Sequence, residues 1–449
     1  MPPIISSENL NPEGMAALLK QALPPGHLAL LRLLADEAVG RSLPLYIIGG
    51  FVRDLLVGHP GLDFDLVVEG DAVALARSIS EKYAGKVTIH PRFGTASWQL
   101  DSASIKRLNI PAFEHGDLPM FDLVSTRSEI YTHPGALPTV KRGTLADDLS
   151  RRDFTINTLA IRLDGEHFGQ LVDQLGGLED LQKGLVRVLH TDSYVDDPTR
   201  ILRAVRYEAR YGFKIVSEDL ELIAAAKSHL GGLSGERLRH EVDLILAENK
   251  SAAMLARLSG LDVLGRIHSL LTWDAQMSRL FENLNKSEPD SWKDVPDVLH
   301  LPHQVGLSYL LWLGRLAPTA IQELASSLDF TASLREALLA LSSLHAELPD
   351  LVNAKPSVVV FRLDDVPLLA VCAACLSANE PTRQILENYL AHWRYIKPKT
   401  TGHDLVKLGL QPGPAFKIIL SSLRTAWLDG ELRTKEEEMI LLDKLIKLV

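Results

Sequence analysis

Two aspartates separated by a single residue are the first candidates for chemistry in this sequence. Asp63 and Asp65 open the segment DFDLVVEG, which we predict to be a strand, so a period of two places both carboxylates on one face. Oxygen ligands at this spacing suit Mg²⁺, which keeps several waters and prefers carboxylates together with substrate phosphates. Because aspartates are also common in turns, the pair alone is weak evidence, and its surroundings decide.

Two glycines upstream of this pair favour a phosphate-binding site. Gly49 and Gly50 follow the apolar run LPLYII and precede the helical pattern FVRDLLV. Backbone N–H groups at a helix N-terminus can bind a triphosphate where no Cβ intrudes, and Arg53 would add positive charge. The alternative is a plain tight turn in which Arg53 pairs with Asp54. Beside the aspartate pair, the phosphate interpretation becomes the better one.

The elements that must position these residues form a βαβαβ series. We expect helices over 27–43, 51–58 and 71–85, and strands over 43–50, 63–70, 86–90 and 96–100. This order predicts a mixed sheet with helices against it. Proline and glycine punctuate residues 104–150, which favours loops there. After Leu178 long helical periods dominate, and only 358–363 looks strand-like, although it fits a buried helix equally well.

Composition bounds the class of protein. The chain has 449 residues, of which 46% are hydrophobic and 23% charged, values that exclude disordered and fibrous classes and predict several domains. A net charge of −10 argues against a nucleic-acid binder that uses its whole surface. We expect Cys372 and Cys375 to be buried in a helix, because no second cysteine pair exists to complete a zinc site. No signal peptide or membrane span is expected, which favours a cytoplasmic location.

One region is locally basic within this acidic protein. Between residues 381 and 427 only Glu387 and Asp404 oppose a series of cations. The series is Arg383, Arg394, Lys397, Lys399, Lys407, Lys417 and Arg424. The region is either a solvated helical surface or a track for a phosphate backbone.

The segment LYIIGGFVRDLLVGHPGLDFDLVVEG (45–70) resembles the signature of nucleotidyltransferases with a polymerase-β-type catalytic head. More narrowly, the chain resembles class II tRNA nucleotidyltransferases and bacterial poly(A) polymerases. Four further blocks follow in the order typical of that family, and residues 402–438 resemble its C-terminal region. The blocks are RRDFTINTLA (151–160), LVDQLGGLEDLQKGLVRVLH (171–190), DDPTRILRAVRYEARYGF (196–213) and SGERLRHEV (234–242).

The resemblance implies a role for each candidate carboxylate in the head. Asp63 and Asp65 would hold Mg²⁺, and Asp122, in MFDLVST, is the candidate for a third catalytic carboxylate from another strand. Asp122 alternatively caps a turn. Arg152 and Asp153 would contact the nucleotide ribose, with Asp153 accepting a hydrogen bond from the 2′-hydroxyl; alternatively they form an ordinary surface pair.

The family reads the incoming base with an aspartate and an arginine, which here are Asp197 and Arg200. A carboxylate accepts from the amino group of cytosine or adenine, and a guanidinium donates to the ring nitrogen, whereas uracil and guanine would fail both contacts. We predict that both side chains share one helix face. In isolation, Asp197 would be a helix cap before Pro198. Asp196 stands where the family usually has glutamate, which leaves its role open.

Further residues complete the implied nucleotide site. Arg203 and Arg206 would bind the triphosphate, unless they pair with neighbours such as Glu208. Residues 126–150 resemble the flexible loop of CCA-adding and A-adding enzymes, which CC-adding enzymes typically have shortened. In that loop Arg127 and Glu129 would help the pocket switch from CTP to ATP, or else form an exposed ion pair. The basic-aromatic segment of poly(A) polymerases has no counterpart here.

The resemblance therefore implies an α/β nucleotidyltransferase head followed by an all-α neck, body and tail, with boundaries at 1–171, 172–250, 251–345 and 346–449. The expected activity is the template-independent, Mg²⁺-dependent addition of CMP and AMP, from CTP and ATP, to the 3′ end of tRNA. The alternatives are an A-adding enzyme that works with a CC-adding partner, a poly(A) polymerase, or a non-catalytic tRNA binder. The expected partners are the tRNA acceptor stem and 3′ end, with no membrane.

Overall fold

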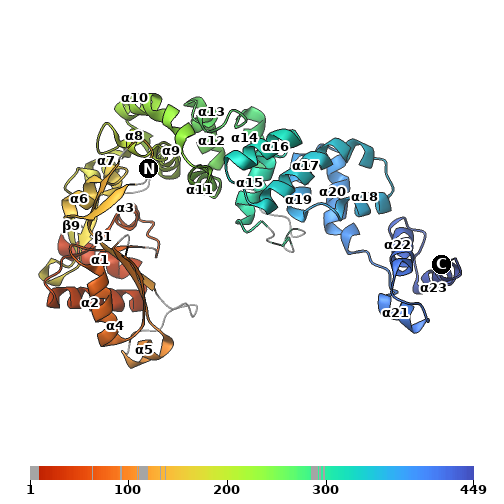
Figure 1. Cartoon of the computed structure of the whole chain (residues 1–449), viewed down its shortest axis with the longest axis horizontal. Helices are drawn as coiled ribbons and strands as arrows, with labels where there is room; N and C mark the ends of the chain where they lie inside the picture. Colours follow the sequence, from red (N-terminus) through yellow and green to blue (C-terminus); the bar gives the residue numbers. More distant parts are fainter. Residues whose placement is uncertain are drawn as a thin grey trace. The chain divides into compact units, whose positions relative to one another are not determined.

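The chain folds into two compact units, Met1–Leu233 and Ser234–Val449. The structure, a computed structural model (Figure 1), describes residues 10–62, 64–91, 94–108, 110, 120–131, 133–136, 138–284, 292, 295, 296 and 299–448. The boundary between the units falls within the segment expected to be the neck. The division into head, neck, body and tail stays a prediction.

A seven-stranded mixed sheet organises the first unit, as predicted. The strand order is β3-β4-β5-β2-β1-β8-β9, and neighbouring strands are antiparallel except for the parallel pair β2 and β5. The strands are β1 Leu45–Ile48, β2 Leu66–Val68, β3 Lys86–His90, β4 Thr95–Gln99, β5 Met120–Ser125, β8 Ala160–Arg162 and β9 Gln170–Val172. The parallel pair β2 and β5 lies near the middle of this order; Asp122 lies on β5, and Asp65 directly precedes β2.

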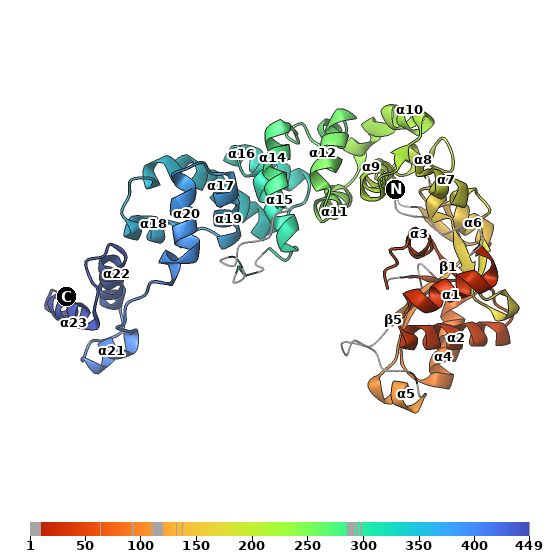
Figure 2. The ribbon, with the colours of Figure 1, turned by 180° about the vertical axis from the view of Figure 1, so that it is seen from behind.

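Helices cover both faces of the sheet. On one face, α4 (Ala72–Tyr83) packs against β4 and β5, and α2 (Pro25–Gly40) packs against α4 (Figure 2). On the other face, Leu145 and Leu149 of α6 (Leu145–Ser150) pack on Tyr46, Ile48 and Val67. Helix α6 packs on Val67, in the middle of β2. The apolar cluster therefore does not extend to the beginning of β2, where polar residues lie.

Residues 126–150 differ from the loop that we expected. Strand β6 (Arg127–Ile130) pairs with β7 (Thr139–Arg142), with Arg127 opposite Arg142. At the base of the hairpin, where the chain enters and leaves it, Gly143 N donates to Thr126 O (3.1 Å) and Thr126 Oγ1 donates to Gly143 O (2.6 Å). Helix α6 follows with a capping box that starts at Thr144. The loop expectation is wrong here because hairpin pairing outweighs the local loop signals.

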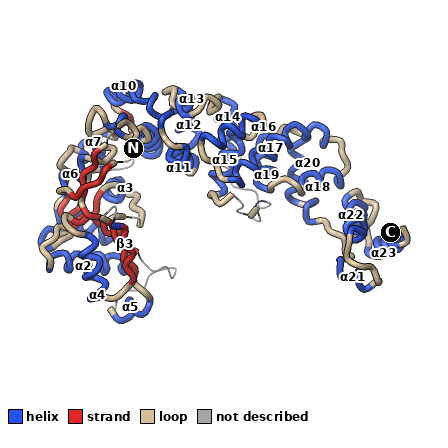
Figure 3. The backbone as a smooth tube through the Cα atoms, in the orientation of Figure 1, coloured by secondary structure: helices blue, strands red, loops and turns tan. Residues whose placement is uncertain are grey.

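The second unit is helical throughout the part that the structure describes, as predicted (Figure 3). Residues 358–363 belong to a helix, and Cys372 and Cys375 are buried in the next one. The helices of the second unit are α11 Gly235–Leu246, α12 Ser251–Gly260, α13 Leu264–Ile267, α14 Ala275–Leu284, α15 His303–Leu313, α16 Pro318–Ser327, α17 Ala332–Leu351, α18 Pro356–Leu363, α19 Leu368–Ser377, α20 Thr382–Ala391, α21 Gly402–Lys407, α22 Pro414–Leu428 and α23 Lys435–Ile446.

Shorter elements complete the first unit. The strands β10 (Leu185–Val186) and β11 (Lys214–Ile215) pair in parallel. The remaining helices are α1 Pro12–Ala22, α3 Gly50–Val57, α5 Ser102–Arg107, α7 Gly177–Lys183, α8 Ser193–Asp196, α9 Arg200–Tyr211 and α10 Ser217–Ala226. Helix α3 ends before Gly58, which adopts φ 82° as its C-terminal cap, so the helix predicted over 51–58 is confirmed.

Candidate active site

The turn between β1 and α3 brings two separately predicted sites into contact. Gly49 adopts φ 89°, a conformation that favours glycine, and a Cβ placed on it would meet Nη1 of Arg152. The Gly49 N–H donates to Leu159 O (3.0 Å). Gly49 is therefore not a free phosphate donor, which corrects our expectation for it. The donors at this turn belong to Gly50 and the following residues, because the first N–H groups of a helix have no intrahelical acceptor.

Arg53 lies in the protein interior rather than at the turn's surface. Its side chain is 3% exposed, and its guanidinium donates to Asp54 (2.9 and 3.0 Å) and to Asn157 Oδ1 (2.5 Å). The guanidinium carbon also lies 4.9 and 4.7 Å from the ring centroids of Tyr207 and Tyr211. This geometry matches the alternative, pairing with Asp54, and makes Arg53 a link between α3 and α9.

Two of the three candidate carboxylates lie at the same level of adjacent parallel strands. Leu66 of β2 is paired with Leu123 of β5, so the residues before them, Asp65 and Asp122, are neighbours in register. Parallel strands lie about 4.8 Å apart, and residues in register share a face. Ser97 of the next strand donates a hydrogen bond to Asp122. The structure therefore brings Asp65 and Asp122 together.

The oxygen chemistry of this pair fits a hard divalent cation. Asp65 is exposed and Asp122 is half-buried, so both carboxylates are reachable from solvent. Asp63 lies outside the residues that the structure describes, and within those residues no three His, Cys, Asp or Glu side chains group as a metal site would require. The Mg²⁺ site stays a prediction, and the carboxylates of Asp65 and Asp122 are suited to it.

A buried ion-pair network surrounds the RRD motif, which is Arg151, Arg152 and Asp153 at the start of the block 151–160. Asp148 of α6 is 0% exposed, and it accepts from Arg151 Nη2 (2.6 Å) and from Arg152 Nη2 (3.1 Å). We did not predict Asp148. Its spacing of three and four residues from the two arginines would have indicated the pairing. Asp148 holds Arg152 over the Gly49 turn.

Asp153 and Arg203, predicted as separate contacts, are paired with each other. Arg203 Nη2 lies 2.6 Å from Asp153 Oδ2, and Asn157 Nδ2 donates to Asp153 Oδ1 (2.8 Å). Burial alone would raise the pKa of the Asp153 carboxyl, but the Arg203 charge and the hydrogen bonds from Asn157 and Phe154 N–H outweigh it and hold that pKa below its ordinary value. Arg206, also buried, lies with its guanidinium carbon 5.7 Å from the Tyr207 ring centroid.

The two residues expected to read the base do not share a helix face. Helix α9 begins at Arg200, and Asp197 is extended (φ −136°, ψ 94°), so the helix-face argument is wrong. They still lie within one turn, because Arg200 N donates to Asp197 O (3.0 Å). The Asp197 side chain accepts from Thr199 N (3.1 Å) and Thr199 Oγ1 (2.7 Å). These bonds form a local turn before α9, whose N-cap is Thr199, so Asp197 is not the helix cap that we considered as the alternative.

Arg200 connects to the hairpin through Arg151. Arg200 is 4% exposed, and it donates to Ser193 Oγ and, through Nη2, to Arg151 O (2.9 Å). Arg151 Nη1 in turn donates to Glu129 Oε1 (3.1 Å), which lies 3.2 Å from Arg127 Nη2. Arg127 and Glu129 thus form part of a network with Arg200 rather than an isolated exposed pair.

The hairpin also contacts the segment before α9. Gly135 N lies within hydrogen-bond distance of Val195 O (3.3 Å) and Asp196 O (3.2 Å). The Asp196 carboxylate lies 4.0 Å from His190 Nε2. The hairpin, the RRD motif and the start of α9 therefore form one connected structure.

Comparison with known proteins identifies the family. Residues 45–187 match the poly A polymerase head domain. The A-adding tRNA nucleotidyltransferase of Halalkalibacterium halodurans is 33% identical over 96% of this chain and 96% of its own length. The chain belongs to the class II tRNA nucleotidyltransferase family.

Two further relatives show how much specificity varies within this family. The CC-adding tRNA nucleotidyltransferase of Deinococcus radiodurans is 30% identical over 90% of both chains. The solved CCA-adding enzyme of Thermotoga maritima, complexed with tRNA, is 29% identical with a TM-score of 0.75, over 97% of this chain and 98% of that one. Membership of the tRNA nucleotidyltransferases therefore leaves open which nucleotides are added.

The second unit of this tRNA nucleotidyltransferase carries the basic segment. Part of it is internally paired, since Arg424 donates to Asp364 Oδ2 (2.6 Å) and Arg383 donates to Ala378 O (2.9 Å). Arg383 also lines a hollow with Arg279 and Arg315. Within the described ranges, no helix combines the length and the hydropathy that a bilayer crossing requires. The use of this segment for tRNA stays a prediction.

Proposed function

We propose that this chain transfers AMP from ATP to the 3′ end of tRNA and releases pyrophosphate. The observation that carries the proposal is the position of Asp65, directly before β2, level with Asp122 on β5. The end of β1 lies at the same edge, because Ile47 of β1 pairs with Leu66 of β2. Carboxylates that can hold a metal ion, beside N–H groups that can bind phosphates, are suited to phosphoryl transfer.

The reaction forms a bond between the terminal ribose oxygen and the α-phosphorus, and breaks the bond from that phosphorus to the β-phosphate. Mg²⁺ held by Asp63, Asp65 and Asp122 would lower the pKa of the ribose hydroxyl and neutralise phosphate charge. The N–H groups that begin α3 at Gly50 would hold the triphosphate. Arg152, positioned by Asp148, would contact the nucleotide beside them.

We further propose that Asp197 and Arg200 select the base. Arg200 is anchored by Ser193 and the Arg151 carbonyl, which would restrict its guanidinium to one orientation. A fixed donor beside a carboxylate rejects bases with the wrong hydrogen-bonding edge, because buried groups would be left unpaired. The link from Arg200 to Glu129 would let the hairpin influence that choice.

Two versions of this activity differ in the nucleotides added. Addition of A alone is supported by the relative that is 33% identical over nearly its full length, which is named A-adding. In that case a partner enzyme adds the two cytidines. Complete CCA addition, which the sequence favoured, is supported by the similarity to the Thermotoga maritima enzyme.

One assay tests the proposal and separates the two versions. Labelled CTP or ATP is supplied with Mg²⁺ to three tRNA transcripts: one lacking CCA, one ending in C and one ending in CC. Extension of only the CC-ended transcript, and only by A, indicates an A-adding enzyme. Growth of the first transcript by CCA indicates a complete CCA-adding enzyme. Absence of incorporation into all three would refute nucleotidyl transfer.

A further inference from the structure

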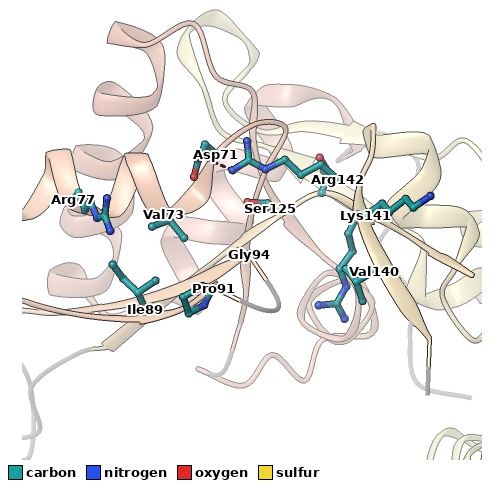
Figure 4. A pocket seen from close by; sticks show the side chains of 12 residues that line it. Asp71, Val73, Arg77, Ile89, Pro91, Gly94, Ser125, Val140, Lys141 and Arg142 are labelled. Carbon is teal, nitrogen blue, oxygen red and sulfur yellow. Dashed lines mark ion pairs between the residues drawn. The ribbon is translucent and has the colours of Figure 1, made fainter. Parts of the chain in front are cut away.

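A cavity of the first unit, separate from the carboxylates, is lined by arginines. It has a volume of about 350 Å³ and lies between α4, the turn joining β3 to β4, the end of β5, and the β6–β7 hairpin (Figure 4). Arg77 lines it from α4, and Arg127 and Arg142 line it from the hairpin. Asp71 is the acidic residue of its lining.

The acidic residue is already engaged by the protein. Asp71 Oδ2 lies 2.6 Å from Arg142 Nη2, and Asp71 Oδ1 accepts from Ala74 N (3.0 Å) as the cap of α4. Figure 4 shows Asp71 and Arg142 facing each other at one side of the cavity. The charge of Asp71 is therefore neutralised by Arg142, and it does not compensate the other two arginines.

Arg77 and Arg127, the other two arginines of the lining, have N–H donors without an acceptor in the described part of the chain. The buried Nε of Arg127 has no acceptor within the described part of the chain. Arg77 is exposed, and it has no hydrogen bond or ion pair with any residue that the structure describes. Glu129 pairs with Arg127 Nη2 but does not line the cavity. Two guanidinium groups at one concave site favour an oxyanion that accepts several hydrogen bonds.

The walls of the cavity are held in place by backbone contacts. Thr126 N donates to Val68 O (2.9 Å), Ser125 N donates to Gly94 O (3.1 Å), and Ser125 Oγ accepts from Ala72 N (3.1 Å). These bonds join the hairpin, the sheet and α4, so the cavity does not need to be assembled by its ligand.

The position of the cavity indicates which phosphate it takes. Ser125 is paired with Val68, three residues beyond the level of Asp65 and Asp122. This offset corresponds to about 10 Å along the strands and, because it is odd, to the opposite face of the sheet, where α4 lies. A triphosphate held where α3 begins lies at the opposite end of β2. A nucleic-acid strand carries a phosphate at every nucleotide, so one whose 3′ end reaches the carboxylates and that passes the end of β5 would bring a backbone phosphate to this cavity.

We propose that this cavity binds a backbone phosphate of the tRNA strand that is being extended, through Arg77 and Arg127. This inference rests on the proposed function. The same chemistry would accept free pyrophosphate or the phosphates of a nucleotide, so the test has to distinguish these sources.

Arg77 is the residue to change, because Arg127 also pairs with Glu129 and supports the hairpin. The variants are Arg77→Ala and the control Lys86→Ala, which removes one exposed cation from β3 of the same sheet, away from the cavity. The affinity of each full-length protein for a CC-ended tRNA transcript is measured over a series of salt concentrations, together with the KM for ATP and inhibition by pyrophosphate.

Arg77→Ala should weaken tRNA binding about 5- to 10-fold near 0.1 M salt and lessen the slope of log affinity against log salt by about 0.7, the value for one single-strand phosphate. Lys86→Ala should change neither quantity, and the KM for ATP should stay the same in both. Unchanged tRNA affinity and slope in Arg77→Ala would overturn the proposal. Weaker binding of ATP or pyrophosphate with unchanged tRNA binding would also overturn it, in favour of a free phosphate ligand.

The wild-type protein separates this inference from the proposed function. If it binds tRNA in an Arg77-dependent manner but incorporates no nucleotide, the cavity assignment stands and nucleotidyl transfer fails. If it incorporates AMP and Arg77→Ala binds tRNA like wild type, only the cavity assignment fails.

Discussion

Two charged regions of the first unit compensate their charges in different ways. Around the RRD motif, Asp148 and Asp153 are buried (0% and 6% exposed), and each is paired with guanidinium groups at distances from 2.6 to 3.1 Å. At the beginning of β2 and β5, Asp65 is exposed, and Asp122 hydrogen-bonds the neutral hydroxyl of Ser97. The first region buries its carboxylates against guanidinium groups, whereas the second places its carboxylates at a surface that solvent reaches.

This difference separates aspartates that stabilise the fold from aspartates that are available for chemistry. A carboxylate buried against arginine is costly to leave without its partner, so it preserves the shape of its surroundings. A carboxylate at an exposed strand end retains its attraction for cations. Removal of the first kind should therefore reduce stability, and removal of the second kind should reduce activity while the fold remains.

The largest effect on activity should come from Asp65. Asp65→Ala should lower kcat for AMP transfer by at least about 10³-fold, because a carboxylate expected to hold metal beside the reacting phosphate is lost. The melting temperature and the affinity for tRNA should stay near wild type, since the residue is exposed. Asp36→Ala, at an exposed position on α2, is the control and should remain active. Transfer by Asp65→Ala at near wild-type rates would refute its assignment as a metal ligand.

Asp148 should give the opposite outcome. Asp148→Asn keeps the shape but removes the charge that pairs with Arg151 and Arg152, and should lower the free energy of unfolding by about 3 kcal/mol. Asp147→Asn is a neighbouring control, because Asp147 is exposed and serves in the capping box of α6, which is worth about 1 kcal/mol. Urea denaturation of both variants provides the measurement. Equal losses in the two would remove the distinction between buried and exposed carboxylates.

The sequence predicted the elements whose signals are local. Periodicity and turn residues within a few positions predicted the strand before Gly49, the helix that ends at Gly58 and the α4 helix over 72–83. The β6–β7 hairpin was missed, because its register pairs Arg127 with Arg142 across a segment rich in turn residues. The run 358–363 is β-branched but helical, since tertiary packing overrides propensity.

The candidate site was predicted less completely than the fold. Family motifs indicated Asp65, Asp122 and Arg200, but they did not indicate what each side chain contacts. Arg53 is buried between tyrosine rings, and Gly49 N–H is already used, so neither acts as its motif suggested. Such contacts join residues 110 to 158 positions apart and follow from the fold rather than from spacing.

Arg200 tests whether the internally paired region also has a chemical role. Arg200→Ala should reduce discrimination of ATP over UTP and GTP about 10- to 100-fold, because one of the two base contacts is lost. The ratio of kcat/KM values is measured within one preparation, so any partial loss of folding cancels. Arg210→Ala removes an exposed cation from the same helix and should leave the ratio unchanged. Unaltered discrimination in Arg200→Ala would confine this arginine to its structural contacts with Ser193 and Arg151.

The smallest effect, that of Asp153 on the melting temperature, should appear only at acidic pH. The pKa of Asp153 is held below the ordinary 3.8 against the opposing effect of burial, chiefly by Arg203. A carboxyl whose pKa is lower in the folded state contributes stability above its unfolded pKa and loses it as the pH falls through the folded value. The wild-type melting temperature should therefore fall more steeply than that of Asp153→Asn between about pH 5 and pH 3, although the variant starts lower. Parallel curves would show that Asp153 binds the same number of protons in both states, and that its pairing with Arg203 does not stabilise the charged form.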